Sequence, residues 1–271
     1  MTLYIGDKPV GLMKVVKDTK YIEKTKFGVS IDDLLGNVDE NGSYSKRSAP
    51  VSLNLSGVKS TANFAFAYLF AYYFSKELTI TANDLVSVGE RAFYYAAYTA
   101  GKIDKFVATF DSLTEIKNSY AFSYFGPAGA DEYSVVFLSL EYIKGTAVFD
   151  HAFSGTFVNS GQIDLGTVFP KLRHVEGSTV FGTAVPSSST KRIIVRLNLV
   201  ETIIGPTSQY SAAFYNLYGD FYFPKCTQAE NYIFYPGNKC VVHFAAANQA
   251  AIEACPGYDK MFGASEIYFD L

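Results

Sequence analysis

Side chains that catalyse reactions or hold metal ions are scarce in this chain, and those present are scattered. The histidines His151, His174 and His243 have no spacing that would place two of them on one metal ion. His243 lies within an apolar run, which is typical of a structural histidine. The cysteines match no CxxC metal pattern, which predicts reduced, partly buried thiols and leaves one disulfide open; they are Cys226, Cys240 and Cys255. We expect neither a metal site nor a cofactor.

The acidic residues do not form the pair that hydrolytic chemistry needs. A β-solenoid can cleave glycans when two carboxylates recur at matching positions of its coils, but Asp84, Asp111 and Asp164 fall at different strand phases. The adjacent Asp32 and Asp33 point in different directions and are typical of a helix start. Motifs for a nucleophile elbow, a phosphate-binding loop or a zinc protease are absent from the sequence. The residues therefore predict a protein that is not an enzyme.

Aromatic side chains are the abundant functional groups of this sequence. It has 23 Phe and 21 Tyr but no Trp, a composition that suits strands and extended contact surfaces. Four tyrosines flank recurring Ala-Phe pairs: Tyr94, Tyr95, Tyr98 and Tyr124. They either pack between neighbouring segments with their hydroxyl groups in water, or present an aromatic face that binds a ligand. The residues alone leave both interpretations open.

Composition excludes several classes of protein. Hydrophobic residues make up 49% of the chain and charged residues 18%, which indicates a folded protein. The net charge of −3 gives no basic surface for nucleic acid. The longest uncharged apolar run, residues 62–74, is shorter than the roughly 20 residues that cross a bilayer, so we expect no membrane insertion. The first residues lack the pattern of a secretory signal, so we expect release by a route such as lysis.

An internal repeat positions these side chains. Five leucines are each followed three residues later by Val or Ile, and eight or nine residues later by Phe; they are Leu55, Leu85, Leu113, Leu140 and Leu172. The phenylalanines assigned to them are Phe64, Phe93, Phe122, Phe149 and Phe181. Weaker copies begin at Val200 and Cys226. A period near 30 residues predicts a solenoid whose coils each contribute a short strand, a turn with the Leu-x-x-Ile pair, and a return segment with Ala-Phe.

The repeat divides the chain into three regions. Residues 1–50 are expected to hold a small β-hairpin, with a strand at Leu3–Ile5 and another at Val10–Val16. Residues 51–239 form about seven coils, with alternating apolar residues such as Ile163 and Leu165 in their strands. Residues 240–271 form a cap, with a strand at Cys240–Phe244, a helix at Ala245–Ala254 and a last strand at Glu266–Leu271.

The coil at residues 110–122, Phe-Asp-Ser-Leu-Thr-Glu-Ile-Lys-Asn-Ser-Tyr-Ala-Phe, resembles the BspA-like leucine-rich repeats. The resemblance covers roughly residues 51–235. It implies an α+β repeat fold, namely a right-handed leucine-rich-repeat-like solenoid with a parallel β-sheet, a small N-terminal β-hairpin anchor and a C-terminal helix–strand cap. Solenoids of this family serve in surface attachment, so the resemblance implies a binding protein.

Other segments resemble proteins of bacteriophages. Residues 3–10 are similar to the opening of many virion proteins, and residues 26–36 and 242–271 resemble repeat proteins of phages and prophages of gut bacteria. This implies a virion structural protein, a tail, baseplate or head fibre that attaches to a glycan or protein of the host surface. Its particle anchor would bind other virion proteins through Leu3, Tyr4, Ile5, Val10 and Leu12. Fibre-like proteins of this kind are often trimers, so a homotrimer is expected.

Two alternatives remain at this point. The chain is a capsid decoration or scaffold protein without a receptor, or it is an adhesin on the surface of a bacterial cell. The absence of a secretory signal counts against the adhesin, because such a protein must be exported.

Overall fold

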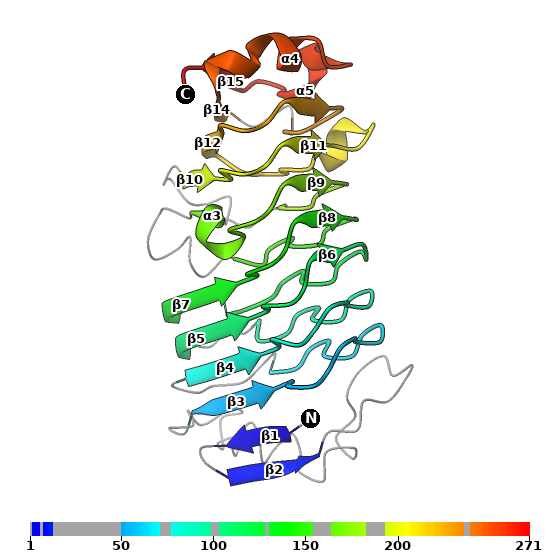
Figure 1. The fold of residues 1–271 in the computed structure, drawn as a ribbon, viewed down its shortest axis with the longest axis vertical. Coiled ribbons are helices and arrows are strands. Elements are labelled where there is room, and N and C mark those ends of the chain that lie inside the picture. Colours follow the sequence, from blue (N-terminus) through cyan, green and yellow to red (C-terminus); the bar gives the residue numbers. More distant parts are fainter. Residues whose placement is uncertain are drawn as a thin grey trace, which may run out of the picture.

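The structure is a computed structural model. It describes residues 2–5, 8–12, 50–70, 77–98, 103–127, 130–153, 164–182, 193–235 and 239–271, with only the backbone described for residues 2–5, 8–12, 51 and 193. The chain forms a mostly parallel β-solenoid of about 7 turns with few helices, stacked along one long axis (Figure 1).

The first wall of the solenoid is a parallel sheet of strands that begin successive coils. Its strands are β3 (Val51–Asn54), β4 (Glu77–Thr81), β5 (Ile103–Thr109) and β7 (Ala130–Val136). Every second residue points inward, so that Leu53, Ile80, Ala108 and Val135 lie in register and are buried. The alternation predicted for these coils is therefore confirmed, because one face of each strand packs on the core while the other faces outward.

The predicted N-terminal hairpin is present and belongs to this same sheet. β1 (Thr2–Ile5) pairs antiparallel with both β2 (Lys8–Leu12) and β3. β2 is the outermost strand of the sheet order β2-β1-β3-β4-β5-β7 (Figure 1). Pro9 lies in this outer strand, where its missing N–H costs no hydrogen bond to an inner neighbour. The remainder of the second predicted strand, residues 13–16, lies outside the described residues.

A second parallel sheet runs through the stack where the sequence predicts only turns. Its strands are β6 (Glu115–Ile116), β8 (Tyr142–Lys144), β9 (His174–Glu176), β11 (Thr202–Ile204) and β13 (Gln228–Glu230). The second residue of each Leu-x-x-Ile pair forms its buried ladder: Ile116, Ile143, Val175, Ile203 and Ala229. Ile203 and Ala229 confirm that the two weakest copies of the repeat are true coils.

The leucine positions form another buried ladder at the corner between the two sheets. Its members are Leu55, Leu85, Leu113, Leu140, Leu172, Val200 and Cys226, each at most 1% exposed. The backbone turns tightly here, because the N–H of the ladder residue donates to the carbonyl three residues earlier in most coils, as from Leu85 to Ala82 and from Leu140 to Phe137. Cys226 thus occupies a leucine site, in accord with its reading as a small hydrophobe.

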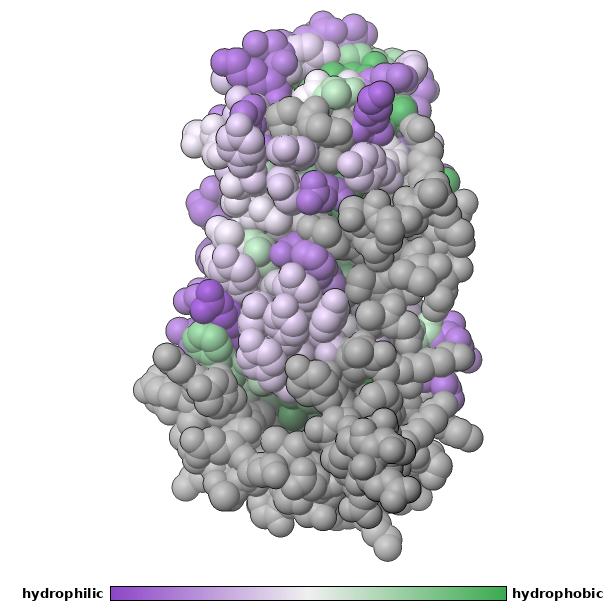
Figure 2. Space-filling view, turned by 180° about the vertical axis from the view of Figure 1, so that it is seen from behind, coloured by the Kyte–Doolittle hydropathy of each residue, from purple (hydrophilic) through white to green (hydrophobic). Residues whose placement is uncertain are grey.

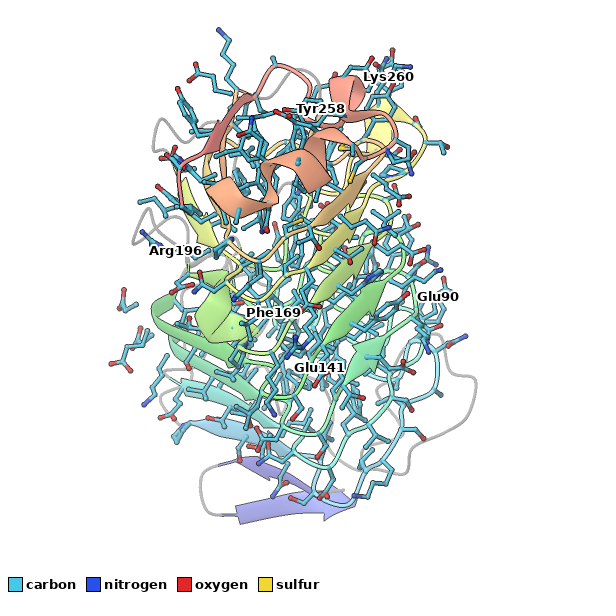
Figure 3. The ribbon with its side chains drawn as sticks, turned by 45° about the horizontal axis from the view of Figure 1, so that its top comes forward. Glu90, Glu141, Phe169, Arg196, Tyr258 and Lys260 are labelled. Carbon is cyan, nitrogen blue, oxygen red and sulfur yellow. The ribbon has the colours of Figure 1, made fainter. Side chains whose placement is uncertain are left out.

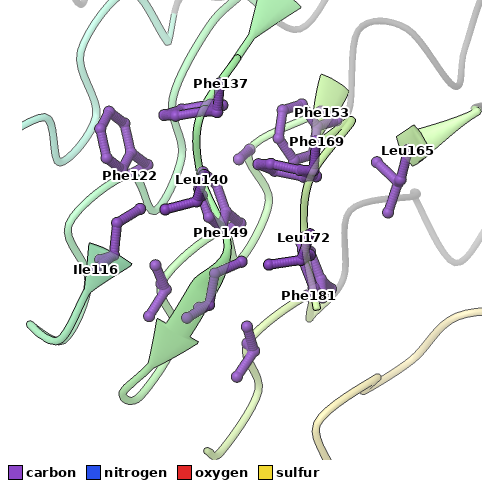
Figure 4. Packing of buried hydrophobic residues seen from close by; sticks show 14 of the residues in the cluster. Ile116, Phe122, Phe137, Leu140, Phe149, Phe153, Leu165, Phe169, Leu172 and Phe181 are labelled. Atoms are coloured by element: carbon purple, nitrogen blue, oxygen red, sulfur yellow. The ribbon is translucent and has the colours of Figure 1, made fainter. Parts of the chain in front are cut away.

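The return segments carry a continuous stack of phenylalanine rings through the core (Figure 4). Neighbouring ring centroids lie 5.0, 5.0, 5.4, 5.8, 5.4 and 5.3 Å apart along the series Phe66, Phe93, Phe122, Phe149, Phe181, Phe214 and Phe234. The assignment of Phe64 to this ladder is wrong. Phe66 stacks on Phe93, whereas Phe64 lies over the Arg91 guanidinium on the outer side of its segment.

The return segments are not strands, and they carry left-handed backbone at recurring positions. Residues at equivalent places have positive φ, among them Arg91 (53°), Tyr120 (57°), Tyr95 (55°) and Tyr124 (55°). Left-handed backbone is costly for side chains of this size, so its recurrence at the same place in each coil marks a built-in feature. This backbone aims every second N–H at the next coil: Tyr95 N donates to Ser123 O at 3.0 Å and Tyr124 N to Asp150 O at 2.7 Å.

Most of these inter-coil hydrogen bonds run in one direction, and the exceptions stand at the ends of two segments, where Ala97 N donates back to Leu69 O and Gly126 N to Ala96 O. The N–H groups of residues 64, 66 and 68 donate to carbonyls 90, 92 and 94, and each later segment repeats the pattern toward the C-terminal neighbour. The bonds between coils stabilise the unusual backbone, and they bring successive side chains of one position directly above each other.

The fifth coil departs from the prediction. A strand is expected at Ile163 and Leu165, but Leu165 opens the short helix α3 (Leu165–Val168), while residue 163 lies outside the described residues. Asp164 caps this helix, because its carboxylate accepts a hydrogen bond from Gly166 N at 2.9 Å. The helix interrupts the first wall, and a new sheet begins beyond it with β10 (Ile193–Arg196) and β12 (Gly219–Phe223).

The C-terminal end contains the predicted helix and strands. β14 (Val241–Phe244) follows β12, and the final strand β15 (Glu266–Phe269) pairs with β14 in parallel. The helix is α4 (Gln249–Glu253), preceded by a 3-10 turn at Ala246–Asn248. The sequence pattern does not predict the second short helix, α5 (Tyr258–Met261). Figure 3 labels two of its residues, Tyr258 and Lys260, at this end of the molecule. One further 3-10 turn occupies Gln209–Ser211.

Candidate functional site

The four tyrosines predicted as a contact surface come together on the return face. Tyr95 lies at the centre, with ring centroids 4.6 Å from Tyr94, 5.3 Å from Tyr98 and 4.2 Å from Tyr124. All four side chains are half-buried. We call these four tyrosines, together with Tyr68 and Tyr120, the aromatic strip. Figure 2 views the molecule from behind, where weakly polar side chains form a broad patch across the middle of the face.

Stacking along the solenoid axis holds the strip together. Tyr95 lies between Tyr68 and Tyr124, with interplanar angles of 16° and 13°. Tyr124 in turn lies between Tyr95 and His151, whose ring is 4.2 Å away at 10°. Both ring faces of Tyr95 and of Tyr124 are therefore covered by neighbouring rings. Only the edges of these two rings, with their hydroxyl groups, can face outward.

Tyr94 and Tyr98 flank this stack with their rings turned. The ring plane of Tyr98 makes 81° with Tyr95 and 87° with Tyr124. Tyr94 makes 74° with Tyr95. The backbone register explains the room for the Tyr94 ring, because Ala67 and Ser123 hold the equivalent positions in the neighbouring coils. Ser123 is fully buried.

Arg91 packs beside the tyrosines. Its guanidinium carbon lies 4.8 Å from the Tyr120 ring centroid and 5.9 Å from that of Tyr94, which are cation–π distances. A nitrogen of the same side chain lies 3.9 Å from a carboxylate oxygen of Glu90, which stands at the outer edge of the stack (Figure 3). Arg91 thus links two coils through aromatic contacts, and its charge is accompanied by an acidic neighbour.

The phenols of Tyr94, Tyr95 and Tyr124 stay neutral over a wider pH range than an ordinary tyrosine. Burial raises the pKa of Tyr94 and of Tyr95 to about 12, and the interaction between neighbouring phenols adds to the effect. Burial likewise raises the pKa of Tyr124. Each hydroxyl can therefore both donate and accept a hydrogen bond.

A histidine and an aspartate end the stack. His151 Nδ1 lies 2.9 Å from Asp150 Oδ1, but the two atoms are not aligned for a hydrogen bond. The two other histidines have the same surroundings, an aromatic ring and a carboxylate. His174 stacks on Tyr142 at 4.3 Å, and His243 stacks on Tyr222 at 4.5 Å. The three histidines lie in separate places, and His243, bonded to the Asp270 carboxylate at 2.9 Å, has the structural surroundings expected of it.

Glu176 joins the most connected polar cluster on the second sheet. Its carboxylate accepts hydrogen bonds from Tyr142 at 3.0 Å and from Lys144 at 2.6 Å, and it lies 3.2 Å from His174 Nε2. The bond from Lys144 is the main reason that the pKa of Glu176 lies below its ordinary value. The groups satisfy one another, so this cluster stabilises the stacking of two coils.

The other reactive groups are placed as structural residues. The three cysteines are free thiols, and burial raises the pKa of Cys226 to about 12. Among the described residues, no three histidine, cysteine or acidic side chains gather as a metal site. Over the same part of the chain, no helix has the length and apolar character needed to cross a membrane.

Sequence reasoning missed the contribution of Arg91, Tyr120 and His151 to the strip. Their common signal is position: Arg91 and Tyr120 each precede an Ala-Phe pair, and His151 follows the Phe of its coil by two residues, as Tyr95 and Tyr124 do. Aligning the coils by the phenylalanine ladder would have found them. The candidate anchor residues Leu3, Tyr4, Ile5, Val10 and Leu12 lie on β1 and β2, for which only the backbone is described.

Comparison of the chain with protein-family models, curated proteins and solved structures finds no match.

Proposed function

We propose that the chain is a non-enzymatic structural protein of a bacteriophage virion, a tail, baseplate or head fibre that displays its solenoid for attachment to the host surface. The observation that carries the proposal is an aromatic strip concentrated on one face of a rigid repeat scaffold. Clustered aromatic side chains at a surface are typical of contact sites. The resemblance of the N-terminal and repeat segments to phage proteins supports a place on the particle.

The coils support assignment to the BspA-like leucine-rich repeats. The best-preserved coils place a leucine at the first corner, an isoleucine or valine in the second sheet, and a phenylalanine in the return segment, as in Leu113, Ile116 and Phe122. These are the positions at which that family repeats. This assignment also implies that the solenoid winds in a right-handed sense, that the repeat is of the α+β class, and that the C-terminal helix and strand form a cap.

The place of the chain in a particle can be tested directly. We expect peptide mass spectrometry of purified virions to identify the chain, and antibody-labelled particle imaging to locate it at the tail, baseplate or head. Size-exclusion chromatography with light scattering should give three times the 29.8 kDa of one chain. Absence from purified particles would contradict a virion role of either kind.

The anchor is proposed to lie at β2. Both edges of β1 are hydrogen-bonded, to β2 and to β3, so among the described strands the outward edge of β2 is the one that would contact other virion proteins. Deletion of residues 1–12 should then release the chain from the particle. Retention of the truncated chain on particles would place the anchor elsewhere.

Attachment needs its own experiment. Purified chain should bind host cells, and the double variant Tyr94→Ala/Tyr98→Ala should bind less, because both rings flank the stack. Unchanged binding would remove these two rings from the proposal.

One observation favours the alternative of a capsid decoration or scaffold protein. The ring faces of Tyr95 and Tyr124 stack on neighbouring rings, so the strip also holds adjacent coils together. A chain found on particles that binds no host cells would support this alternative.

A further inference from the structure

We propose that the aromatic strip recognises a neutral polysaccharide chain, and that it does so through a row of tyrosine hydroxyl groups instead of through ring faces. This inference rests on the proposed attachment function and names its ligand class. The starting observation is the stacking described above, in which Tyr95 and Tyr124 each have ring partners on both faces.

Ring faces of the central row are unavailable to a ligand. A sugar that stacks on an aromatic residue needs an open face, but Tyr95 is covered by Tyr68 at 5.3 Å and by Tyr124 at 4.2 Å. Tyr124 is covered on its other side by His151 at 4.2 Å. Since the side chains are only half-buried, what remains accessible is their edges.

The backbone beneath the strip is unavailable too. A peptide ligand usually binds a β-structure by adding hydrogen bonds to open N–H and C=O groups. Here the N–H groups of Tyr68, Tyr95 and Tyr124 donate to carbonyls of the next coil at 2.8, 3.0 and 2.7 Å. These three N–H groups are therefore not available to pair with a bound peptide.

What the strip offers to a ligand is a row of phenol hydroxyl groups, in which Tyr95 is hydrogen-bonded to Tyr94 and to Tyr124. A phenol both donates and accepts, as sugar hydroxyl groups do, so each hydroxyl keeps a further position for a sugar. Burial raises the pKa of Tyr94 and of Tyr95 to about 12, so these phenols carry no charge at physiological pH. Arg91 is engaged by rings and by Glu90, so the strip has no unaccompanied charge that would favour an acidic ligand.

The repetition selects a polymer over a single sugar. Tyr68, Tyr95 and Tyr124 occupy one position in three consecutive coils, so their hydroxyl groups recur at the step of the solenoid. A chain of sugar units presents hydroxyl groups at a regular step as well. Binding of several units at once raises the overall affinity well above that of one contact.

The test removes hydroxyl groups from the strip, in the full chain, while every ring is kept. The double variant Tyr95→Phe/Tyr124→Phe keeps every ring contact and deletes two hydroxyl groups. Its matched control is Tyr210→Phe/Tyr218→Phe, which deletes hydroxyl groups from side chains that are 69% and 45% exposed and outside the strip. The probes are polysaccharides released from the envelopes of the cells that the chain binds. They are embedded in native gels for one binding measurement. For a second measurement they are titrated into the protein while the tyrosine absorbance is followed.

We expect the unmodified chain and the control to bind the released polysaccharide, and the strip variant to lose about tenfold in affinity. Equal binding by the strip variant would overturn the hydroxyl row, whatever the ligand. Binding to cells that survives periodate treatment but not protease treatment would overturn the polysaccharide and indicate a protein receptor. A chain that binds neither cells nor polysaccharide would overturn the proposed attachment function itself.

Discussion

Replacement of two neighbouring rings of the phenylalanine ladder should reveal how strongly adjacent coils depend on each other. Phe122 is fully buried and stacks on Phe93 at 5.0 Å with an interplanar angle of 6°. Phe122→Leu removes three carbon atoms from a packed site, which should lower the free energy of unfolding by about 2–3 kcal/mol from lost burial and the remaining cavity. Phe93→Leu should cost about as much, because Phe93 is also fully buried.

The informative quantity is the coupling between the two substitutions. Stacked ring pairs contribute about 0.5–1.5 kcal/mol beyond burial, so Phe93→Leu/Phe122→Leu should be less damaging than the two single losses together by about that amount. The control pair is Phe122→Leu/Phe181→Leu. Phe149 separates these two rings, stacking on each at 5.4 and 5.8 Å, so their coupling should be close to zero.

Urea unfolding followed by far-ultraviolet circular dichroism would measure all six proteins under one set of conditions. The m-value serves as a check that each variant unfolds as the parent does. A coupling near zero for the neighbouring pair, or an equal coupling for the separated pair, would refute the nearest-neighbour account of this solenoid.

Four further predictions follow from single sites. Gly177→Ala should destabilise the chain by more than about 2 kcal/mol, because a Cβ would lie 2.0 Å from a carbonyl oxygen of the preceding coil, and thermal unfolding would measure it. Tyr133→Phe should cost about 1–2 kcal/mol in urea unfolding, since its hydroxyl donates to a main-chain carbonyl at 3.0 Å that would lose its partner. Cys226, which is fully buried, should react with a thiol reagent only after unfolding, whereas labelling at the rate of an exposed thiol would contradict its placement. The pKa of Glu176 is lowered in the folded state, so its contribution to stability is complete above about pH 4.5 and is lost as the pH falls through the lower folded value. The melting temperatures of Glu176→Gln and of the parent should therefore converge on acidification. A difference in melting temperature that widens at low pH would refute this sign.

The period of the sequence predicted most of the architecture because the core positions are simple. A leucine, an isoleucine or valine, and a phenylalanine each repeat at one place per coil, and each forms a buried ladder. The hairpin, the last strands and the helix near Gln249 follow from local patterns of alternation and alanine content.

Three features could not be predicted, each for a physical reason. The strands of the second sheet have two or three residues, too few for an alternating pattern to stand out, as at Glu115 and Ile116. The return segments use left-handed backbone at Arg91 and Tyr120, residue types that carry no signal for it; the hydrogen bonds between coils enforce it. The shift from Phe64 to Phe66 needed the register of the neighbouring coil, which only the stacking with Phe93 supplies.

The candidate site was predictable in its members but not in its geometry. The clustering of Tyr94, Tyr95, Tyr98 and Tyr124 follows from their places beside Ala-Phe pairs. Which ring faces are covered depends on vertical alignment between coils, a property of the whole stack. The proposed recognition through hydroxyl groups depends on that alignment, because it covers the ring faces of Tyr95 and Tyr124.

The one-way hydrogen bonds of the return segments give the solenoid an electrical polarity. In ordinary sheets the peptide dipoles largely cancel, whereas here alternate N–H groups of the return segments, as at residues 91, 93 and 95, point toward the C-terminal end. The dipoles add as they do in an α-helix, but with the opposite sense relative to chain direction. The positive end of this column lies toward α5, where the N–H groups of Ile233 and Phe234 both donate to Met261 O. The negative end lies at the first coil, so the two ends of the return face attract opposite charges although the chain as a whole is almost neutral.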